Sequence, residues 1–197
     1  MLDTLVNRGV ALLALLLLSP VLVVTAVAVR LSSPGPVIYR QVRVGRGGRR
    51  FEIYKFRTMV NGADRQSANV SPEGDPRVTG VGRWLRARYV DELPQLFNVL
   101  KGDMNLVGPR PETPEYVALY TATERKVLAV RPGLAGLSTL AFMDEAERLA
   151  AVDDPALHYR EVLLHERVGA DLAYLERRSL AYDARLLCRQ VMAILRR

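Results

Sequence analysis

The sequence is poor in several residue types that define whole classes of protein. Its 197 residues include one cysteine, Cys188, and two histidines. A single cysteine excludes an internal disulfide framework and a multi-cysteine metal site. Cys188 is predicted to be a small buried or interfacial residue in a helix. Aromatic residues make up 7% of the chain, which argues against a stacking platform for single-stranded nucleic acid.

Repeats and known nucleotide cradles are also missing. The sequence has no internal repeat, no low-complexity tract and no GxxxxGK[ST] run. Its length suits one compact domain with a short appendage. Positive charge, by contrast, is in excess, with a formal net charge of +7. This charge predicts an anionic partner, which could be nucleic acid, a phosphorylated substrate or an anionic lipid surface.

One long apolar run, residues 10–29, contains no charged residue and is flanked by Arg8 and Arg30. About 20 apolar residues suffice to span a bilayer core, and the run is longer than the core of a cleaved signal peptide. Proline removes a backbone donor, so the central Ser19-Pro20 pair predicts a kink. Two topologies stay open on physical grounds: a bent helix that spans the membrane, and a re-entrant helix broken at this pair.

The rest of the chain, residues 34–197, predicts a mainly helical α+β domain. After the turn-rich SSPGP segment, residues 37–44 and 51–56 alternate around a glycine-rich turn and predict a β-hairpin. Residues 61–82 are polar and rich in Gly, Pro and Asp, which predicts a loop. Helical patterns follow over residues 84–100 and 112–130 and again after Asp144. Pro94 predicts a first turn or a kink within the first of these patterns, so Asp91 and Glu92 are expected beside a helix start.

The last helical pattern is a basic amphipathic one. Apolar residues from Leu180 to Leu195 fall on one face, while Arg185 and Arg189 lie elsewhere. Such a helix either packs its apolar face on the domain core or lies at a membrane surface. The sequence leaves both alternatives open.

A dense cluster of charged residues between Arg86 and Arg110 suggests phosphate chemistry. At its centre, Asp91 and Glu92 are adjacent, and neighbouring positions on a helix point about 100° apart, so distinct roles are expected. A carboxylate can attack phosphorus when cations offset the repulsion between the two anions. Mg²⁺ binds through one or two carboxylates plus substrate phosphates. An Asp-Glu pair is also common on solvated surfaces and at helix starts.

A second cationic cluster, Lys55 and Arg57, follows the predicted hairpin. Alternation along a strand would put both side chains on the same side, where they could face one anion. The alternative is an ordinary basic edge strand.

Three runs occur in a characteristic order across most of residues 19–137. They are SSPGPVIYRQVRVGRGGRRFEIYKFRTM, GDPRVTGVGRWLRARYVDELPQLFNVLKGDMNLVGPRPE and RPGLAGL. Together they resemble the bacterial sugar transferase family, specifically the small monotopic phosphoglycosyl transferases that initiate glycoconjugate assembly. The match weakens after Gly136, where many relatives carry a W-x-Q-like run and this chain reads LSTLAF. The sugar specificity is therefore left undefined.

The resemblance implies a reaction and its residues. Asp91 corresponds to the nucleophile that attacks the β-phosphate of a UDP-sugar and releases UMP, and Glu92 completes the dyad. Polyprenyl (undecaprenyl) phosphate then accepts the phosphosugar in a ping-pong sequence. Mg²⁺ is the implied cofactor, with Asp91 as its protein ligand. The residues assigned to substrate phosphate are Lys55, Arg57, Arg86 and Arg110.

The resemblance also implies where the protein lies. Residues 1–33 would form a re-entrant helix with Ser19-Pro20 at its vertex, so both termini would be cytoplasmic at the bacterial inner membrane. The chain has no counterpart of the extra transmembrane helices of longer relatives and is expected to be the minimal catalytic form. A homodimer is left open.

Two other functions compete with this one. A membrane-anchored basic module for anionic lipid or nucleic acid would explain the charge, but not the acidic Asp91-Glu92 pair inside the basic region. No nucleic-acid partner is therefore expected. A phosphatase with the same aspartyl intermediate differs in one respect, because water and not a lipid phosphate would accept the phosphosugar.

Overall fold

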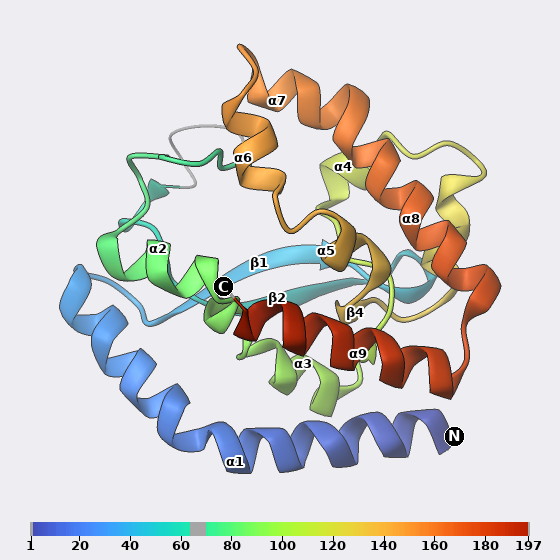
Figure 1. Ribbon diagram of the computed structural model, residues 1–197, viewed down its shortest axis with the longest axis horizontal. Helices are drawn as coiled ribbons and strands as arrows, with labels where there is room; N and C mark the ends of the chain where they lie inside the picture. The colour runs from blue at the N-terminus through green and yellow to red at the C-terminus, as the bar shows by residue number, and fades with distance from the viewer. Residues whose placement is uncertain (1, 64–69, 197) are drawn as a thin grey trace.

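The computed structural model describes residues 2–63 and 70–196, arranged around a central β-hairpin (Figure 1). Its elements in chain order are α1 (Leu2–Ser32), β1 (Ile38–Val44), η1 (Arg46–Gly48), β2 (Arg50–Phe56), α2 (Gly80–Ala87), η3 (Val90–Glu92), α3 (Gln95–Lys101), β3 (Asn105–Val107), α4 (Pro114–Ala118) and η4 (Glu124–Ala129). They continue with β4 (Gly133–Ala135), α5 (Leu137–Ala141), α6 (Glu145–Ala150), α7 (Pro155–His158), the π-helical η5 (Tyr159–Leu163), α8 (Leu164–Arg177) and α9 (Leu180–Leu195). The mainly helical α+β class is confirmed.

The predicted hairpin is confirmed. Strands β1 and β2 pair antiparallel, from Ile38 opposite Phe56 to Val44 opposite Arg50. The turn between them needs glycine, because Gly47 and Gly48 have φ values of 67° and 80°. A second, small sheet pairs β3 with β4 in parallel. The predicted loop over residues 61–82 lies partly outside the described residues, and its described end passes into α2 at Gly80.

The helical stretch predicted over residues 84–100 is present as two helices, α2 and α3, and the helix start predicted at Pro94 is confirmed. The earlier break at Tyr89 was not predicted. Helix α2 ends because Tyr89 adopts a left-handed conformation with φ 55°, and the chain then makes one 3₁₀ turn, η3. Pro94 directly precedes α3, where its missing N–H costs no helical hydrogen bond. The break turns η3 towards the interior. The helix predicted over residues 112–130 is likewise divided, into α4 and η4.

Helix α1 is continuous and bends near its middle (Figure 1), with Pro20 inside it. The Ser19 hydroxyl donates to the carbonyl oxygen of Leu16 at 2.8 Å, a contact that accompanies bending in helices. One side of α1 packs on the domain through Ala11 and Leu15. The other side exposes large apolar side chains such as Leu17. By length and composition, Thr4–Ser32 could cross a membrane.

Both ends of α1 are bonded to the same domain. Near its start, the Asn7 side chain accepts from the Leu106 N–H at 2.7 Å, and Arg8 donates to the Lys101 carbonyl at 3.0 Å. At its other end, Arg57 donates to the carbonyl of Ser33 at 2.7 Å. The helix therefore lies along the domain over its whole length.

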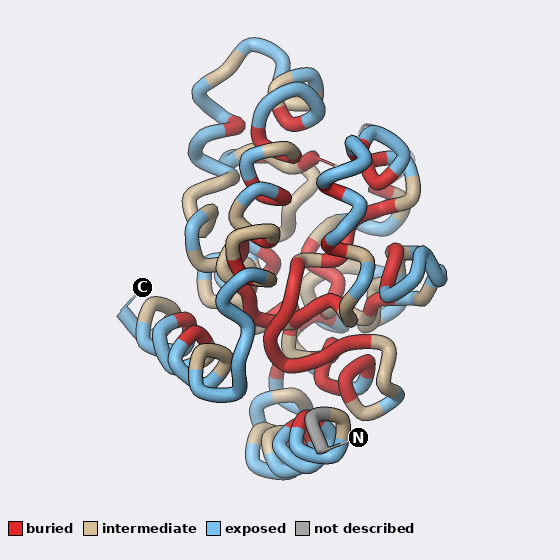
Figure 2. The backbone as a smooth tube through the Cα atoms, turned by 90° about the vertical axis from the view of Figure 1, so that its right-hand side faces the viewer, coloured by how far each residue is buried: buried red, intermediate tan, exposed pale blue. Residues whose placement is uncertain are grey.

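Helix α9 packs on the domain through Leu186 and Gln190, which are buried. The apolar face predicted over residues 180–195 points largely outward, because Leu180, Val191 and Leu195 are all exposed. Cys188 is exposed as well, so the prediction of burial is wrong for it. Figure 2 shows α1, near the N-terminus, and α9, near the C-terminus, at the periphery of the molecule. Most of the buried backbone lies in the interior, away from these two helices.

Candidate active site

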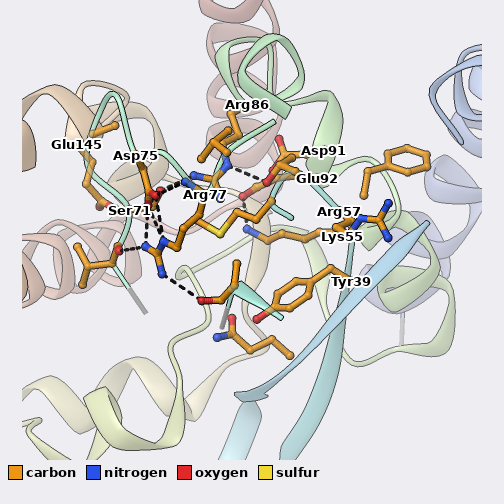
Figure 3. Close-up of a pocket in the computed structure, with 18 of the residues that line it drawn as sticks. Tyr39, Lys55, Arg57, Ser71, Asp75, Arg77, Arg86, Asp91, Glu92 and Glu145 are labelled. Carbon is orange, nitrogen blue, oxygen red and sulfur yellow. Dashed lines mark hydrogen bonds and ion pairs between the residues drawn. The ribbon is translucent and has the colours of Figure 1, made fainter. Parts of the chain in front are cut away.

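A cavity of about 1130 Å³ opens between the hairpin, α2, η3 and the segment from α5 to α8 (Figure 3). Asp91 and Glu92 both line it. The left-handed turn at Tyr89 and the 3₁₀ turn that follows place the two carboxylates inside the protein, where the residues are 8% and 5% exposed. The alternative of a solvated surface pair is therefore wrong.

Glu92 is held by two cations. Its Oε1 lies 2.7 Å from Lys55 Nζ and 3.0 Å from Arg110 Nη2, and its Oε2 accepts from Arg110 Nη1 at 3.4 Å. Burial opposes ionisation of Glu92, but the charges of Arg110 and Lys55 outweigh it and hold the pKa far below its usual range. Burial in turn lowers the pKa of Lys55, although Glu92 favours the charged form. Glu92 is thus a fixed anion.

Asp91 has different surroundings. Within the described part of the chain, no side chain forms an ion pair with it. Burial, together with the charge of Glu92, raises the pKa of Asp91 to about 6. The Asp91 carboxylate therefore stays largely ionised at neutral pH, and residues 2–63 and 70–196 provide no side-chain hydrogen bond to its oxygens. This combination suits a nucleophile better than a structural anion.

Arg86 belongs to a second polar cluster on the cavity wall. Its Nε donates to Thr58 Oγ1 at 2.8 Å and its Nη1 donates to Ser71 Oγ at 2.7 Å. Ser71 donates to Asp75, and Arg77 forms an ion pair with Asp75 at 2.6 Å. These contacts hold the guanidinium of Arg86 at the cavity through neutral hydroxyls, so its charge is available to an anion.

Arg57 and Lys55 have different protein partners, so the same-side arrangement predicted from alternation is wrong. Lys55 points to Glu92, whereas Arg57 Nη2 donates to the carbonyl and hydroxyl oxygens of Ser33 at the end of α1 (Figure 3). Strand β2 ends at Phe56, so the alternation does not extend to Arg57. Arg57 does line the cavity, and its Nε and Nη1 lack hydrogen-bond partners within the described residues.

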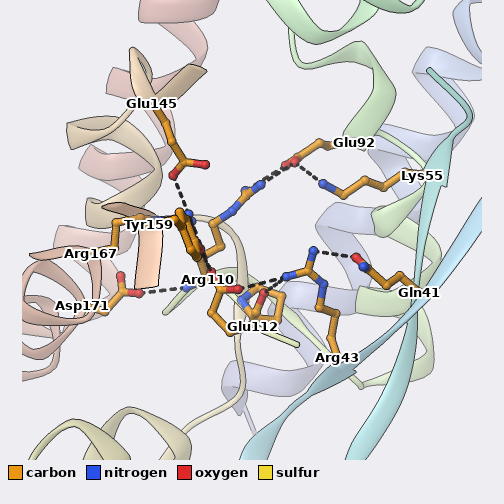
Figure 4. Close-up of polar contacts among 11 residues, drawn as sticks. Gln41, Arg43, Lys55, Glu92, Arg110, Glu112, Glu145, Tyr159, Arg167 and Asp171 are labelled. Carbon is orange, nitrogen blue, oxygen red and sulfur yellow. Dashed lines mark hydrogen bonds and ion pairs between the residues drawn. The ribbon is translucent and has the colours of Figure 1, made fainter. Parts of the chain in front are cut away.

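A buried polar network supports Arg110 (Figure 4). The backbone N–H of Arg110 donates to Asp171 at 3.0 Å. Two residues on, Glu112 forms an ion pair with Arg43 at 3.2 Å and accepts from the Tyr159 hydroxyl at 2.8 Å. Both Glu112 oxygens are therefore satisfied. The GPRPE segment is fixed on either side of Arg110, which aims the Arg110 guanidinium at Glu92.

Sequence reasoning missed most of this network. Glu112 is the last residue of one of the three family-like runs, but the sequence gives no indication that it supports the site. Arg167 and Asp171 lie one turn apart on α8, a spacing that resembles an ordinary charged helix face, yet both are buried. Tyr159 lies in the π-helical turn η5, a feature often found at functional sites. No sequence signal predicts that turn.

The residues present fit a magnesium ion held mostly by substrate. Among the described residues, no group of three or more His, Cys, Asp or Glu side chains could hold a metal by itself. Cations occupy Glu92, whereas among the described residues no ion pair involves the neighbouring Asp91, which makes Asp91 the candidate ligand of this carboxylate pair. One carboxylate plus phosphate oxygens and water is a common Mg²⁺ site.

The fold and site together define a protein with a long, partly exposed apolar helix and a cavity lined by Lys55, Arg86 and Arg110. The chain belongs to the bacterial sugar transferase family, whose family model matches residues 1–197.

Curated relatives carry the similarity further. The chain is 40% identical, over 190 residues, to a UDP-glucose:undecaprenyl-phosphate glucose-1-phosphate transferase of Caulobacter vibrioides, covering 91% of this chain and 64% of the relative. It is 38% identical, over 200 residues, to a UDP-N-acetylgalactosamine-undecaprenyl-phosphate N-acetylgalactosaminephosphotransferase of Aeromonas hydrophila, covering 96% of this chain and 44% of the relative. It therefore spans less than two thirds of the length of either protein.

Proposed function

We propose that this chain transfers a sugar 1-phosphate from a UDP-sugar to undecaprenyl phosphate with release of UMP. The observation that carries the proposal is the buried Asp91 carboxylate, free of ion pairs among the described residues, beside a Glu92 that two cations hold. Family membership and the names of the relatives support the donor and the acceptor.

The reaction has two displacements at one phosphorus atom. An Asp91 carboxylate oxygen attacks the β-phosphorus, and the bond from that phosphorus to the bridging oxygen breaks, so that UMP leaves with the bridging oxygen. The sugar phosphate is then esterified to Asp91. A phosphate oxygen of undecaprenyl phosphate attacks the same phosphorus, the bond to Asp91 breaks, and undecaprenyl diphosphate sugar is formed.

The neighbouring residues handle charge. Arg86, Arg110 and Lys55 offset the repulsion between Asp91 and the diphosphate and stabilise the charge that develops in transfer. Glu92 fixes Lys55 and Arg110 in place. Mg²⁺, with Asp91 as its proposed protein ligand, would neutralise charge on the diphosphate oxygens. A phosphate contact for Arg57 remains a prediction that rests on its unpartnered Nε and Nη1.

The same proposal includes the membrane. We take α1 to be a re-entrant helix with Ser19-Pro20 at its vertex, in the inner membrane of a bacterium, and the catalytic domain to lie on the cytoplasmic face. The bend and the bonding of both helix ends to one domain support this topology. A lipid phosphate would then reach the cavity from the bilayer surface.

The test is UMP release by the purified protein from a panel of UDP-sugars with Mg²⁺, with and without undecaprenyl phosphate. Sustained release that depends on the lipid is expected for one or a few donors. Release with water as the sole acceptor would indicate the phosphatase, and no release from any donor would refute the proposed reaction.

Asp91→Asn should lower UMP release by about 10³-fold or more, since an amide cannot form the ester and a nucleophile is lost. Membrane insertion, measured by flotation with lipid vesicles, should be unchanged. Asp153→Asn is the matched control, because Asp153 is exposed and should retain full activity. Normal activity of Asp91→Asn would disprove the nucleophile assignment.

A further inference from the structure

The cavity wall contributed by α5 and α6 carries polar groups that the proposed phosphate chemistry does not use. Thr139 on α5 is 5% exposed, and its hydroxyl has no hydrogen-bond partner within the described residues. Glu145, at the start of α6, lines the same cavity six residues further along the chain. One of its oxygens, Oε2, meets Arg167 Nη1 at 2.5 Å.

Glu145 differs from the other paired carboxylates around the cavity. Glu92, Asp75 and Glu112 each have both oxygens bonded to cations or hydroxyls. In the described part of the structure, Glu145 Oε1 makes no such contact. Its side chain is 30% exposed, so the open oxygen can meet a ligand in the cavity.

Arg167 gives the Glu145 carboxylate a fixed position. The Arg167 side chain is 7% exposed and also lies near Glu112 and the Tyr159 hydroxyl, 3.6 Å and 3.0 Å away (Figure 4). All three contacts use the same nitrogen, Arg167 Nη1, so Glu145 is anchored at a buried point that Glu112 and Tyr159 also contact. A preorganised carboxylate of this kind gives specificity at low entropic cost.

The ligand group that suits this wall is a hydroxyl. A second negative charge would repel phosphate, whereas a carboxylate oxygen accepts strongly from sugar hydroxyls, and a threonine hydroxyl can donate or accept. Figure 4 shows Glu145 and Arg110 in the same cluster of polar side chains, where Glu92 chiefly, and Glu145 to a lesser degree, raise the pKa of Arg110. The wall therefore adjoins the cations assigned to the diphosphate, where the sugar bonded to the β-phosphate must lie.

We propose that Glu145 and Thr139 form the hexose subsite of the donor, with Glu145 Oε1 accepting from hydroxyls of the sugar. This inference rests on the proposed function. The subsite lies beyond Gly136, where the chain reads LSTLAF in place of the W-x-Q-like run expected for many relatives. The names of the two relatives differ in their sugar, glucose and N-acetylgalactosamine.

The experiment measures binding in an Asp91→Asn background, which keeps the cavity but cannot turn over. Affinities for UDP and for UDP-glucose, UDP-galactose and UDP-N-acetylgalactosamine are compared by calorimetry with Mg²⁺. UDP carries both phosphates and no sugar, so the difference between it and a UDP-sugar reports on the hexose alone. Glu145→Gln and Thr139→Val are tested, with Glu161→Gln as the control because Glu161 is exposed.

Glu145→Gln and Thr139→Val should each weaken binding of the preferred UDP-sugar at least fivefold and leave UDP affinity within twofold. In the active protein, the ratio of kcat/KM between UDP-glucose and UDP-galactose should change by about tenfold. Equal losses for UDP and UDP-sugar, or no loss for either, would overturn the subsite. If the parent protein releases no UMP, the proposed function is refuted. The hexose subsite is judged separately, by whether the variants weaken binding of the UDP-sugar more than binding of UDP.

Discussion

Asp91 and Glu92 are neighbours with similar burial, yet their surroundings drive their acid strengths apart. Glu92 is in contact with Lys55 and Arg110, and its pKa falls far below the usual range. Burial instead raises the pKa of Asp91 to about 6. Pairs of titratable groups separated in this way mark a division of roles. Here one carboxylate anchors the cations, and the other remains free to react.

Asp171 offers a pH-dependent prediction at the same scale. Burial raises its pKa from 3.8 to about 6. Between pH 3.8 and pH 6 the Asp171 carboxyl ionises in the unfolded chain but stays protonated in the folded protein, so the folded protein loses stability as pH rises. Above pH 6 the full loss in the free energy of unfolding is about 3 kcal/mol. Asp171→Asn keeps an acceptor for the Arg110 N–H and remains neutral. The variant should therefore gain stability over the parent as pH rises.

Chemical denaturation at pH 5 and pH 8 measures the effect. Between these values the parent should lose about 1–2 kcal/mol more than Asp171→Asn does. Asp171→Ala is the control, since it leaves the Arg110 N–H unpaired and should be destabilised at both pH values. Identical pH slopes for the parent and Asp171→Asn would show that Asp171 is ionised in the folded protein at pH 5.

At the scale of the elements, helix α2 carries Arg86 and packs closely on the backbone that follows β2. Gly82 allows this close approach because it has no side chain. A Cβ atom at Gly82 would lie 2.0 Å from the Thr58 carbonyl oxygen, whereas one at Gly80 would meet nothing within 4 Å. Gly82→Ala must therefore push α2 away from Thr58, which is also the partner of Arg86 Nε. Overpacking of this kind costs about 1–3 kcal/mol.

Gly82→Ala should lower the thermal midpoint and reduce UMP release by at least about tenfold, since Arg86 moves with its helix. Gly80→Ala is the matched control in the same helix and should leave both quantities unchanged or slightly improved. Thermal unfolding followed by circular dichroism, together with the UMP assay, measures both. Full activity in Gly82→Ala would mean that the position of α2 is not critical.

The elements also mark the limit of what the sequence could predict. Alternation predicted the hairpin because its two strands pair locally. Over residues 84–100, proline predicted the helix start at Pro94, but apolar spacing gives no sign of the left-handed Tyr89 that ends α2. The charges of α8 were equally uninformative, since Arg167 and Asp171 become buried only through partners far along the chain, Glu145 and Arg110. Asp91 and Glu92 were found because their run matched a family.

For the whole molecule, the question is how α1 can enter a membrane, as proposed, while both of its ends stay bonded to one domain. A straight helix across the bilayer would pull its first half away from the domain. It would break the bonds of Asn7 and Arg8 and expose the buried Ala11 and Leu15. The bend at Pro20 removes this conflict, so proline should control topology.

Pro20→Leu restores the missing backbone donor and should shift molecules towards a spanning helix, with the N-terminus on the far side of the membrane. The measurement uses a cysteine added at the N-terminus, in a Cys188→Ser background, and a membrane-impermeant maleimide applied to sealed vesicles of known orientation. Pro20→Leu combined with Asn7→Ala should shift more molecules, because Asn7 holds the start of α1 on the domain through Leu106. Leu17→Ala, an exposed position on the same helix, serves as the control and should label like the parent. If labelling stays on the cytoplasmic side in both Pro20 variants, the proposed re-entrant path would depend on the polar contacts and packing of α1 and not on its proline.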